Sequence, residues 1–184
     1  MNRKPSLRQI KTAICKSLRK VFRNDAAVIR IGQERAIAHL LACELSRHIT
    51  KWDVDVEYNR VGGGVDRKRN IHGRVKIPDV IIHSRLTELN IAWIEIKVNN
   101  NEVDADVKTL TEFTSNASDG CQGIVYNYGI SISLLPIAQV IIVRNGKVLE
   151  KFNVTKSAQQ GGADGARDLL LPGAFRSRIR GGMG

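Results

Sequence analysis

Cysteine is scarce in this sequence, and no hydrophobic run is long. Only 3 of the 184 residues are cysteines, and Cys15, Cys43 and Cys121 lie far apart without a CxxC pair. An odd, scattered set of cysteines favours neither a disulfide framework nor a zinc site, and it fits a reducing compartment. The longest apolar runs, such as Ile137–Val143, are too short for a membrane span, and the first residues do not resemble a signal peptide. We therefore expect a cytoplasmic protein with no membrane span.

Two common functional motifs are also missing. The triple glycine Gly62–Gly64 lacks the Gly-Lys-Ser/Thr ending of a phosphate-binding loop. The sequence contains no GxSxG, so nothing points to a serine hydrolase. His39, His48 and His72 form no spaced cluster with cysteines or acids. The strongest remaining signal is the distribution of charge.

Acidic residues are outnumbered, 18 against 29 basic ones, which gives a formal net charge of +11. Such an excess favours polyanionic partners, nucleic acid first and an anionic membrane surface second. Residues 1–24 contain no acid, and their basic residues are Arg3, Lys4, Arg8, Lys11, Lys16, Arg19, Lys20 and Arg23. A second basic cluster, interrupted only by Asp66, consists of Arg60, Arg67, Lys68, Arg69, Arg74 and Lys76. Two such clusters flanking the acidic residues described below favour nucleic acid over a merely solvated surface.

Hydrophobic periodicity and turn residues predict the order of helices and strands. Helices are expected over residues 6–24, 33–49 and 102–115, the first opened by a Ser6–Gln9 capping box. Strands are expected over residues 52–58, 75–83, 91–98, 123–128, 138–144 and 147–154, the last two joined by a turn at Asn145-Gly146. A short helix is considered near residues 166–171.

This order predicts an α/β protein with a mixed central sheet flanked by helices. We divide the chain into a basic amphipathic N-terminal helix (1–24), a core domain (25–156) and a Gly/Arg-rich, flexible tail (157–184). The first helix can pack on the domain, follow phosphates or lie on a membrane.

A group of charged residues occurs in the strands predicted over 75–83 and 91–98. In the first, Asp79 shares a face with Ile77 and Ile81, and Pro78 should lie at an edge or a bulge. In the second, Glu95 and Lys97 are two residues apart and face the same side. If the two strands pair, the three charged side chains converge on one patch.

Two carboxylates on adjacent strands suit a hard cation such as Mg²⁺, which prefers oxygen ligands. Such an ion polarises a phosphodiester and lowers the pKa of water. A nearby lysine can orient that water and stabilise charge, or act as a base if its own pKa is lowered. The alternative is that Glu95 and Lys97 are ordinary residues on the solvent face of an edge strand. The combination of Pro-Asp on one strand with Glu-x-Lys on the next favours the site.

With Pro78-Asp79 and Glu95-Ile96-Lys97, the chain resembles the PD-(D/E)xK nuclease superfamily over about residues 30–145. The resemblance implies a restriction-endonuclease-like α-β-β-β-α-β core, to which the N-terminal basic helix is an addition. It implies that Asp79 and Glu95 bind the metal with the main-chain carbonyl of Ile96, and that Lys97 serves the attacking water.

The same resemblance implies two further site residues. Glu34 matches an acid that many members carry on the first core helix, with a catalytic and metal-binding role, and Glu44 is the alternative deeper in that helix. Lys108 matches a polar residue on the helix after the motif, where it would contact nucleic acid.

The resulting expectation is a nuclease that depends on Mg²⁺ or Mn²⁺, with DNA favoured over RNA and an endodeoxyribonuclease as the favoured form. The second basic cluster and the N-terminal helix would bind phosphates without reading sequence. A homodimer is considered because two copies can cut both strands. The alternatives are a non-catalytic nucleic-acid-binding module on the same scaffold, and an adaptor that uses the basic helix at a membrane surface or a protein partner.

Overall fold

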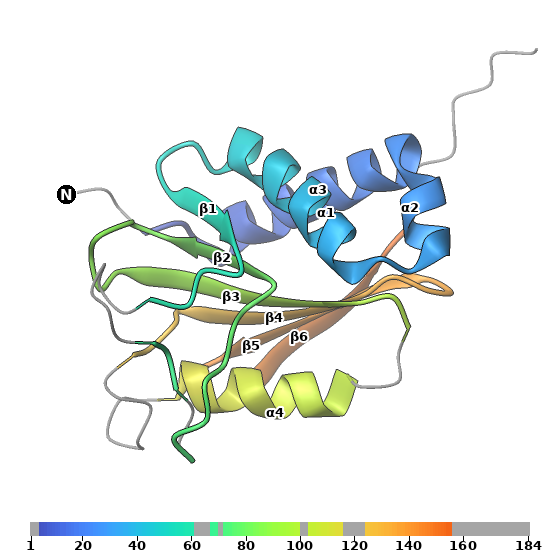
Figure 1. The fold of residues 1–184 in the computed structure, drawn as a ribbon. Helices are drawn as coiled ribbons and strands as arrows, with labels where there is room; N and C mark the ends of the chain where they lie inside the picture. Colours follow the sequence, from blue (N-terminus) through green and yellow to red (C-terminus); the bar gives the residue numbers. More distant parts are fainter. Residues whose placement is uncertain (1–3, 61–66, 70–71, 100–102, 116–123, 156–184) are drawn as a thin grey trace, which may run out of the picture.

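The computed structural model describes residues 4–60, 67–69, 72–99, 103–115 and 124–155. A six-stranded sheet lies between two helical layers, with α1, α2 and α3 on one face and α4 on the other (Figure 1). The helices are α1 (Leu7–Asn24), α2 (Ala26–Ile31), α3 (Glu34–His48) and α4 (Val103–Thr114). The strands are β1 (Asp53–Val56), β2 (Val80–His83), β3 (Asn90–Lys97), β4 (Tyr128–Ser133), β5 (Ala138–Arg144) and β6 (Lys147–Val154).

The strands follow one another across the sheet in the order β1 to β6. Only β3 and β4 are parallel neighbours, and the other neighbouring pairs are antiparallel. α4 forms the crossover that a parallel pair requires. The run α3-β1-β2-β3-α4-β4 has the element order that the sequence analysis predicted for the core, and β5 and β6 extend the sheet beyond it. The predicted fold class, a mixed sheet flanked by helices, is confirmed.

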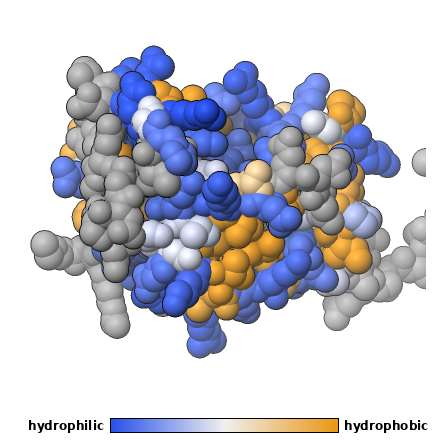
Figure 2. Space-filling model, turned by 90° about the horizontal axis from the view of Figure 1, so that it is seen from below, coloured by the Kyte–Doolittle hydropathy of each residue, from blue (hydrophilic) through white to orange (hydrophobic). Residues whose placement is uncertain are grey.

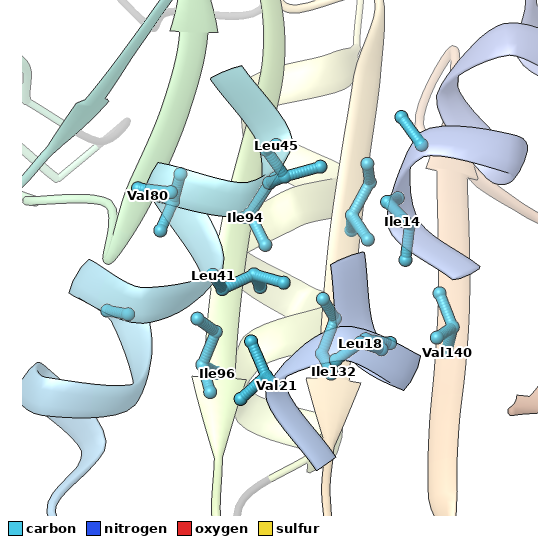
Figure 3. Close-up of a cluster of buried hydrophobic side chains, with 14 of the residues drawn as sticks. Ile14, Leu18, Val21, Leu41, Leu45, Val80, Ile94, Ile96, Ile132 and Val140 are labelled. Carbon is cyan, nitrogen blue, oxygen red and sulfur yellow. The ribbon is translucent and has the colours of Figure 1, made fainter. Parts of the chain in front are cut away.

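The larger hydrophobic core lies between the sheet and the layer of α1 and α3. Leu18 of α1 and Leu41 of α3 face Ile94 and Ile132 of the sheet, and each of the four is at most 1% exposed (Figure 3). The basic residues of α1 occupy its other faces. The N-terminal helix is therefore packed into the body of the domain.

A smaller core lies under α4, on the opposite face of the sheet. Trp93 of β3 stacks on Phe113 of α4 with ring centroids 4.2 Å apart, and Tyr126 meets Trp93 edge-on at 5.3 Å. Leu110 of α4 lies directly over Gly129 of β4, where an added Cβ would be 2.7 Å from the Cβ of Leu110. α4 is therefore held very close to β4.

Most predicted elements are confirmed with small shifts at their ends. The Ser6–Gln9 capping box opens α1, with the side chain of each residue paired to the backbone N–H of the other. The β5–β6 hairpin turns at Asn145 and Gly146, whose φ angles of 50° and 70° are the left-handed values that a type I′ turn needs. The predicted bounds of β5 and β6 coincide with those of the structure.

Two strand predictions are wrong in position. β2 begins only at Val80, so Pro78 and Asp79 precede the strand. Proline has no N–H for the ladder, and the Asp79 carbonyl accepts instead from the N–H of Glu57 at 3.2 Å. β4 begins at Tyr128, where the predicted strand over 123–128 ended.

The local cause of the β4 shift is a contact with the preceding helix. The N–H of Tyr126 donates to the carbonyl of Phe113 at 2.9 Å, which ties this segment to the end of α4 before the chain enters the sheet. α2 was not predicted. It has six residues and ends at Gly32 in the left-handed conformation, and so short a segment shows no clear periodicity.

The surface seen from the α4 side is mostly hydrophilic around a hydrophobic patch (Figure 2). Among the residues that the structure describes, no helix combines the length and apolar character needed to cross a membrane. The predicted tail over 157–184, its short helix over 166–171 and the triple glycine lie outside the described residues.

Candidate active site

The candidate site lies where the ladder between β2 and β3 ends. The last paired residues are Val80 and Ile94, which belong to the core under α1 and α3. Ile81 and Trp93 belong to the core under α4. Because side chains alternate along a strand, Glu95 faces the α4 side of the sheet. Beyond this last pair, the edge of β3 meets an aspartate in place of a strand backbone.

Asp79 and Glu95 are in contact at this point. Oδ2 of Asp79 accepts the main-chain N–H of Ile96 at 2.7 Å, so the carboxylate takes the place of a strand partner. The carboxyl groups of Asp79 and Glu95 lie close enough for a proton on one of them to be shared with the other. The indole Nε1 of Trp93 donates to Oε1 of Glu95. Each carboxylate is therefore oriented by a fixed donor, one from the backbone and one from the smaller core.

The contact changes the acidity of both groups. Burial raises the pKa of Asp79 against the opposing effects of the Ile96 N–H and of Lys97. Burial and the negative charge of Asp79 raise the pKa of Glu95 to about 8. Two carboxylates in contact cannot both be charged at low cost, so the pair holds a proton or attracts a cation.

Lys97 reaches the same patch from the end of β3. Its Nζ lies 3.8 Å from Oε2 of Glu34, and its side chain is 21% exposed. Oε1 of Glu34 accepts the N–H of Val98 at 3.1 Å, which fixes the first residue of α3 to the end of β3. Burial lowers the pKa of Lys97, but Asp106, Glu34 and the carboxylate pair outweigh it and raise the pKa. The ammonium therefore keeps its charge at neutral pH.

Two residues near the site were missed by the sequence analysis. Asp106 of α4 is half-buried, and its charge raises the pKa of both Glu95 and Lys97. Its signal was an acid on the same helical stripe as Val107 and Leu110. Ser131 of β4 pairs with Glu95 in the parallel ladder and is 1% exposed. Because the predicted strand ended at Tyr128, the alternation of side chains over Tyr128–Ser133 was not used to find Ser131.

The donors that could hold a divalent ion are the carboxylates of Asp79 and Glu95. Within the described ranges, no three or more His, Cys, Asp and Glu side chains form a group that could hold a metal ion. Glu34 lies beside Lys97, and its charge also raises the pKa of Asp79, while its metal-binding role stays a prediction. The site brings together Asp79, Glu95 and Lys97, and the roles predicted for them remain predictions.

The predicted nucleic-acid contacts come from two segments of the chain, the second basic cluster and α4. Exposed members of the second basic cluster are Arg60, Arg67, Arg69 and Arg74, and Lys76 is half-buried. Two isolated bridges, Arg60 to Arg67 and Arg69 to Val75, tie parts of this cluster together. Lys108 is exposed on α4, where it lies outside the buried stripe that carries Asp106.

Lys68 differs from its neighbours because it is 1% exposed. Its Nζ donates to the carbonyl of Tyr58 at 3.3 Å and lies 5.2 Å and 5.3 Å from the ring centroids of Tyr58 and Tyr126. Burial lowers the pKa of Lys68 to about 7. A buried amine cannot contact a phosphate at the surface, so the structure argues against the predicted role and leaves Lys68 as an anchor for its segment.

Comparison with known proteins gives little beyond this geometry. No protein-family model and no curated protein sequence matches the chain. One solved chain, from the cryo-electron microscopy structure of the DrdV–DNA complex, aligns with 81% of this chain at 13% identity and a TM-score of 0.49. The chain spans 12% of the length of that neighbour. A similarity of this size assigns neither a family nor a function.

Proposed function

We propose that this protein is a divalent-metal-dependent nuclease that hydrolyses phosphodiester bonds, with DNA as its main substrate. The observation that carries the proposal is the contact between the carboxylates of Asp79 and Glu95 beside the ammonium of Lys97. Buried carboxylates in contact are costly unless a proton or a cation neutralises them. Ordinary surface residues of an edge strand have no reason to adopt this arrangement.

The donor set fits Mg²⁺ or Mn²⁺. Mg²⁺ is usually held by one or two carboxylates and keeps several waters, so two carboxylates suffice from the side chains. The N–H and C=O of one strand residue point to the same edge, and the N–H of Ile96 points to Asp79. The Ile96 carbonyl can therefore complete the protein ligands. When bound, the ion supplies charge stabilisation to the phosphodiester and makes water a stronger nucleophile at neutral pH.

The surrounding residues prepare the site. The Ile96 N–H and the Trp93 indole hold the two carboxylates in place before substrate arrives. Because its pKa is raised, we assign Lys97 to orienting water and stabilising negative charge, not to removing a proton. Glu34 positions Lys97.

The charge of the protein supports a nucleic-acid substrate. A net charge of +11 attracts phosphates without regard to sequence. Arg67, Arg69 and Arg74 are exposed in the segment that leads to Asp79. Contacts of this kind place the backbone of a nucleic acid at the site without selecting bases.

The test is cleavage of a panel of linear, supercoiled, branched and single-stranded DNA and of RNA, with Mg²⁺, Mn²⁺ or EDTA. We expect cleavage of DNA that stops in EDTA. Asp79→Asn, Glu95→Gln and Lys97→Ala should each lower the rate by about 100-fold or more. Glu88→Gln is the matched control, because Glu88 is exposed between β2 and β3, outside the site, and should leave the rate unchanged.

Two results would contradict the proposal. If no substrate is cut with either ion although the protein binds nucleic acid, the chain is a binding module on a nuclease-like scaffold. If cleavage persists in EDTA or in all three site variants, the activity comes from another site or from a contaminant.

A further inference from the structure

A basic groove lies at the end of α3 that is remote from the carboxylate pair. A groove of about 920 Å³ runs between the start of α1 and the turn from α3 into β1. Its basic residues are all exposed and are Lys4, Arg8, Lys16, His48 and Lys51. None of the described residues that line this groove is acidic.

The charges of this groove are not neutralised by neighbouring acids. Lys11, on another face of α1, pairs with Glu150 of β6. In contrast, Arg8, Lys16 and Lys51 take part in no ion pair within the part of the chain that the structure describes. A concave surface lined by one sign of charge concentrates the field and attracts the opposite charge.

The other lining residues suit a phosphodiester backbone. Thr12 and Thr50 place hydroxyl groups along the groove, and such groups commonly contact phosphate oxygens together with lysine and arginine. Trp52 lines the same groove, where it is half-buried and packs against the core. An indole at this place offers a flat surface on which an unpaired base can stack.

The groove and the carboxylate site lie at opposite ends of α3. Glu34, the first residue of this helix, contacts the end of β3, and His48, its last residue, lines the groove. A helix of 15 residues is about 22 Å long. At about 3.4 Å per nucleotide along one strand, this distance corresponds to roughly six nucleotides.

We propose that the groove binds the phosphodiester backbone of a nucleic acid at a second point, about six nucleotides from the carboxylate site. Assigning both surfaces to one nucleic acid rests on the proposed nuclease function. Binding in the groove itself needs no hydrolysis. Substrates too short to reach from Asp79 to Lys51 should therefore bind more weakly.

The test measures binding in EDTA, by fluorescence anisotropy, to labelled duplex DNA, single-stranded DNA and RNA of equal length. The groove variant is Arg8→Glu/Lys51→Glu, and the matched control is Lys20→Glu/Arg23→Glu, which makes the same charge change at exposed positions outside the groove. We expect the groove variant to bind at least tenfold more weakly. Its slope of log affinity against log salt should fall by about 2, because two phosphate contacts are lost.

Three outcomes decide the proposal. A loss in the groove variant with less than a threefold change in the control supports it, and the nucleic acid most affected identifies the ligand. Equal losses in both variants would mean that only overall charge matters, and the groove would not be a site. If anionic vesicles, but no nucleic acid, bind more weakly to the groove variant, the partner is a membrane surface and the proposal is wrong.

Cleavage measured in parallel separates this inference from the proposed function. If no substrate is cut but the groove variant still loses nucleic-acid binding, the groove proposal is supported and the proposed nuclease function is wrong. If cleavage is normal and the groove variant binds nucleic acid like the control, the nuclease function is supported and the groove proposal is wrong.

Discussion

The carboxyl group of Glu95 has a pKa of about 8 in the native protein, raised from 4.5 by burial and by Asp79. An unfolded chain restores the ordinary value, so between about pH 4.5 and 8 the native state binds more protons than the unfolded state. The free energy of unfolding should therefore fall as the pH rises through this window. The raised pKa of Asp79 acts in the same direction.

Replacing the carboxyl group of Glu95 should make the free energy of unfolding depend less on pH. In Glu95→Gln, with EDTA present, the free energy of unfolding should fall less between pH 5 and pH 8 than in the original protein. Urea titrations at several pH values measure it, and Glu88→Gln serves as the control because it removes an exposed carboxyl group outside the site. Profiles that stay parallel would show that Glu95 titrates normally.

Mg²⁺ should raise the Tm of the original protein more at pH 8 than at pH 6, because the ion replaces a proton.

Some residues of the candidate site can be predicted from the sequence, and others cannot. The shared side of Glu95 and Lys97 follows from the alternation of side chains along β3, which is a local property. Asp79 lies before β2, and its hydrogen bonds with the N–H groups of Ile96 and Glu57 place it. The contribution of Asp106 depends on how α4 crosses the sheet, and no spacing within α4 reports that crossing. The burial of Lys68 depends on two tyrosines that are distant in sequence from each other. Long-range packing of this kind leaves no periodic signal.

Among the elements, the placement of α4 depends on a glycine. A Cβ at Gly129 would lie 2.7 Å from the Cβ of Leu110 and 3.2 Å from Cγ2 of Thr114, so the helix would have to move. Gly129→Ala should lower the free energy of unfolding by about 1–3 kcal/mol, the usual cost of overpacking. It should also reduce cleavage, because Asp106 on α4 acts on Glu95 and Lys97.

Thermal unfolding followed by circular dichroism measures the first effect, and the cleavage assay measures the second. Ser46→Ala on α3 is the control, since its exposed hydroxyl donates only to the local carbonyl of Cys43. A Gly129→Ala protein as stable and as active as the original would mean that α4 adjusts without cost.

The elements that could be predicted are those whose signals are local. The β5–β6 hairpin has its turn residues and its alternation in one stretch of sequence, and its bounds are reproduced. β2 and β4 were misplaced because their ends are set by contacts from elsewhere, the Glu57 N–H at Asp79 and the Phe113 carbonyl at Tyr126. Tertiary hydrogen bonds, not propensity, decide where these two strands begin.

On the scale of the whole molecule, the division into a basic helix and a core domain stays a prediction, and the packing of α1 bears on how independent the two parts can be. Ile10, Ile14, Leu18 and Val21 of α1 are each at most 1% exposed and belong to the same core cluster as the sheet. The periodicity of residues 1–24 shows an apolar stripe but not what covers it. The structure shows that α3 and the sheet cover it, so the helix carries both packing and charge.

A chain that begins at Asp25 should therefore fail to fold cooperatively, because removing α1 exposes the apolar face of α3 and of the sheet to water. Heat and urea unfolding should show no sharp transition, and a dye that binds exposed apolar surface should fluoresce strongly. The full-length variant Arg19→Ala/Lys20→Ala/Arg23→Ala separates charge from packing. These three side chains are exposed on α1, so each substitution should change the Tm by no more than about 2 °C. If the shortened chain melts as sharply as the full one, α1 is an accessory to an independent core.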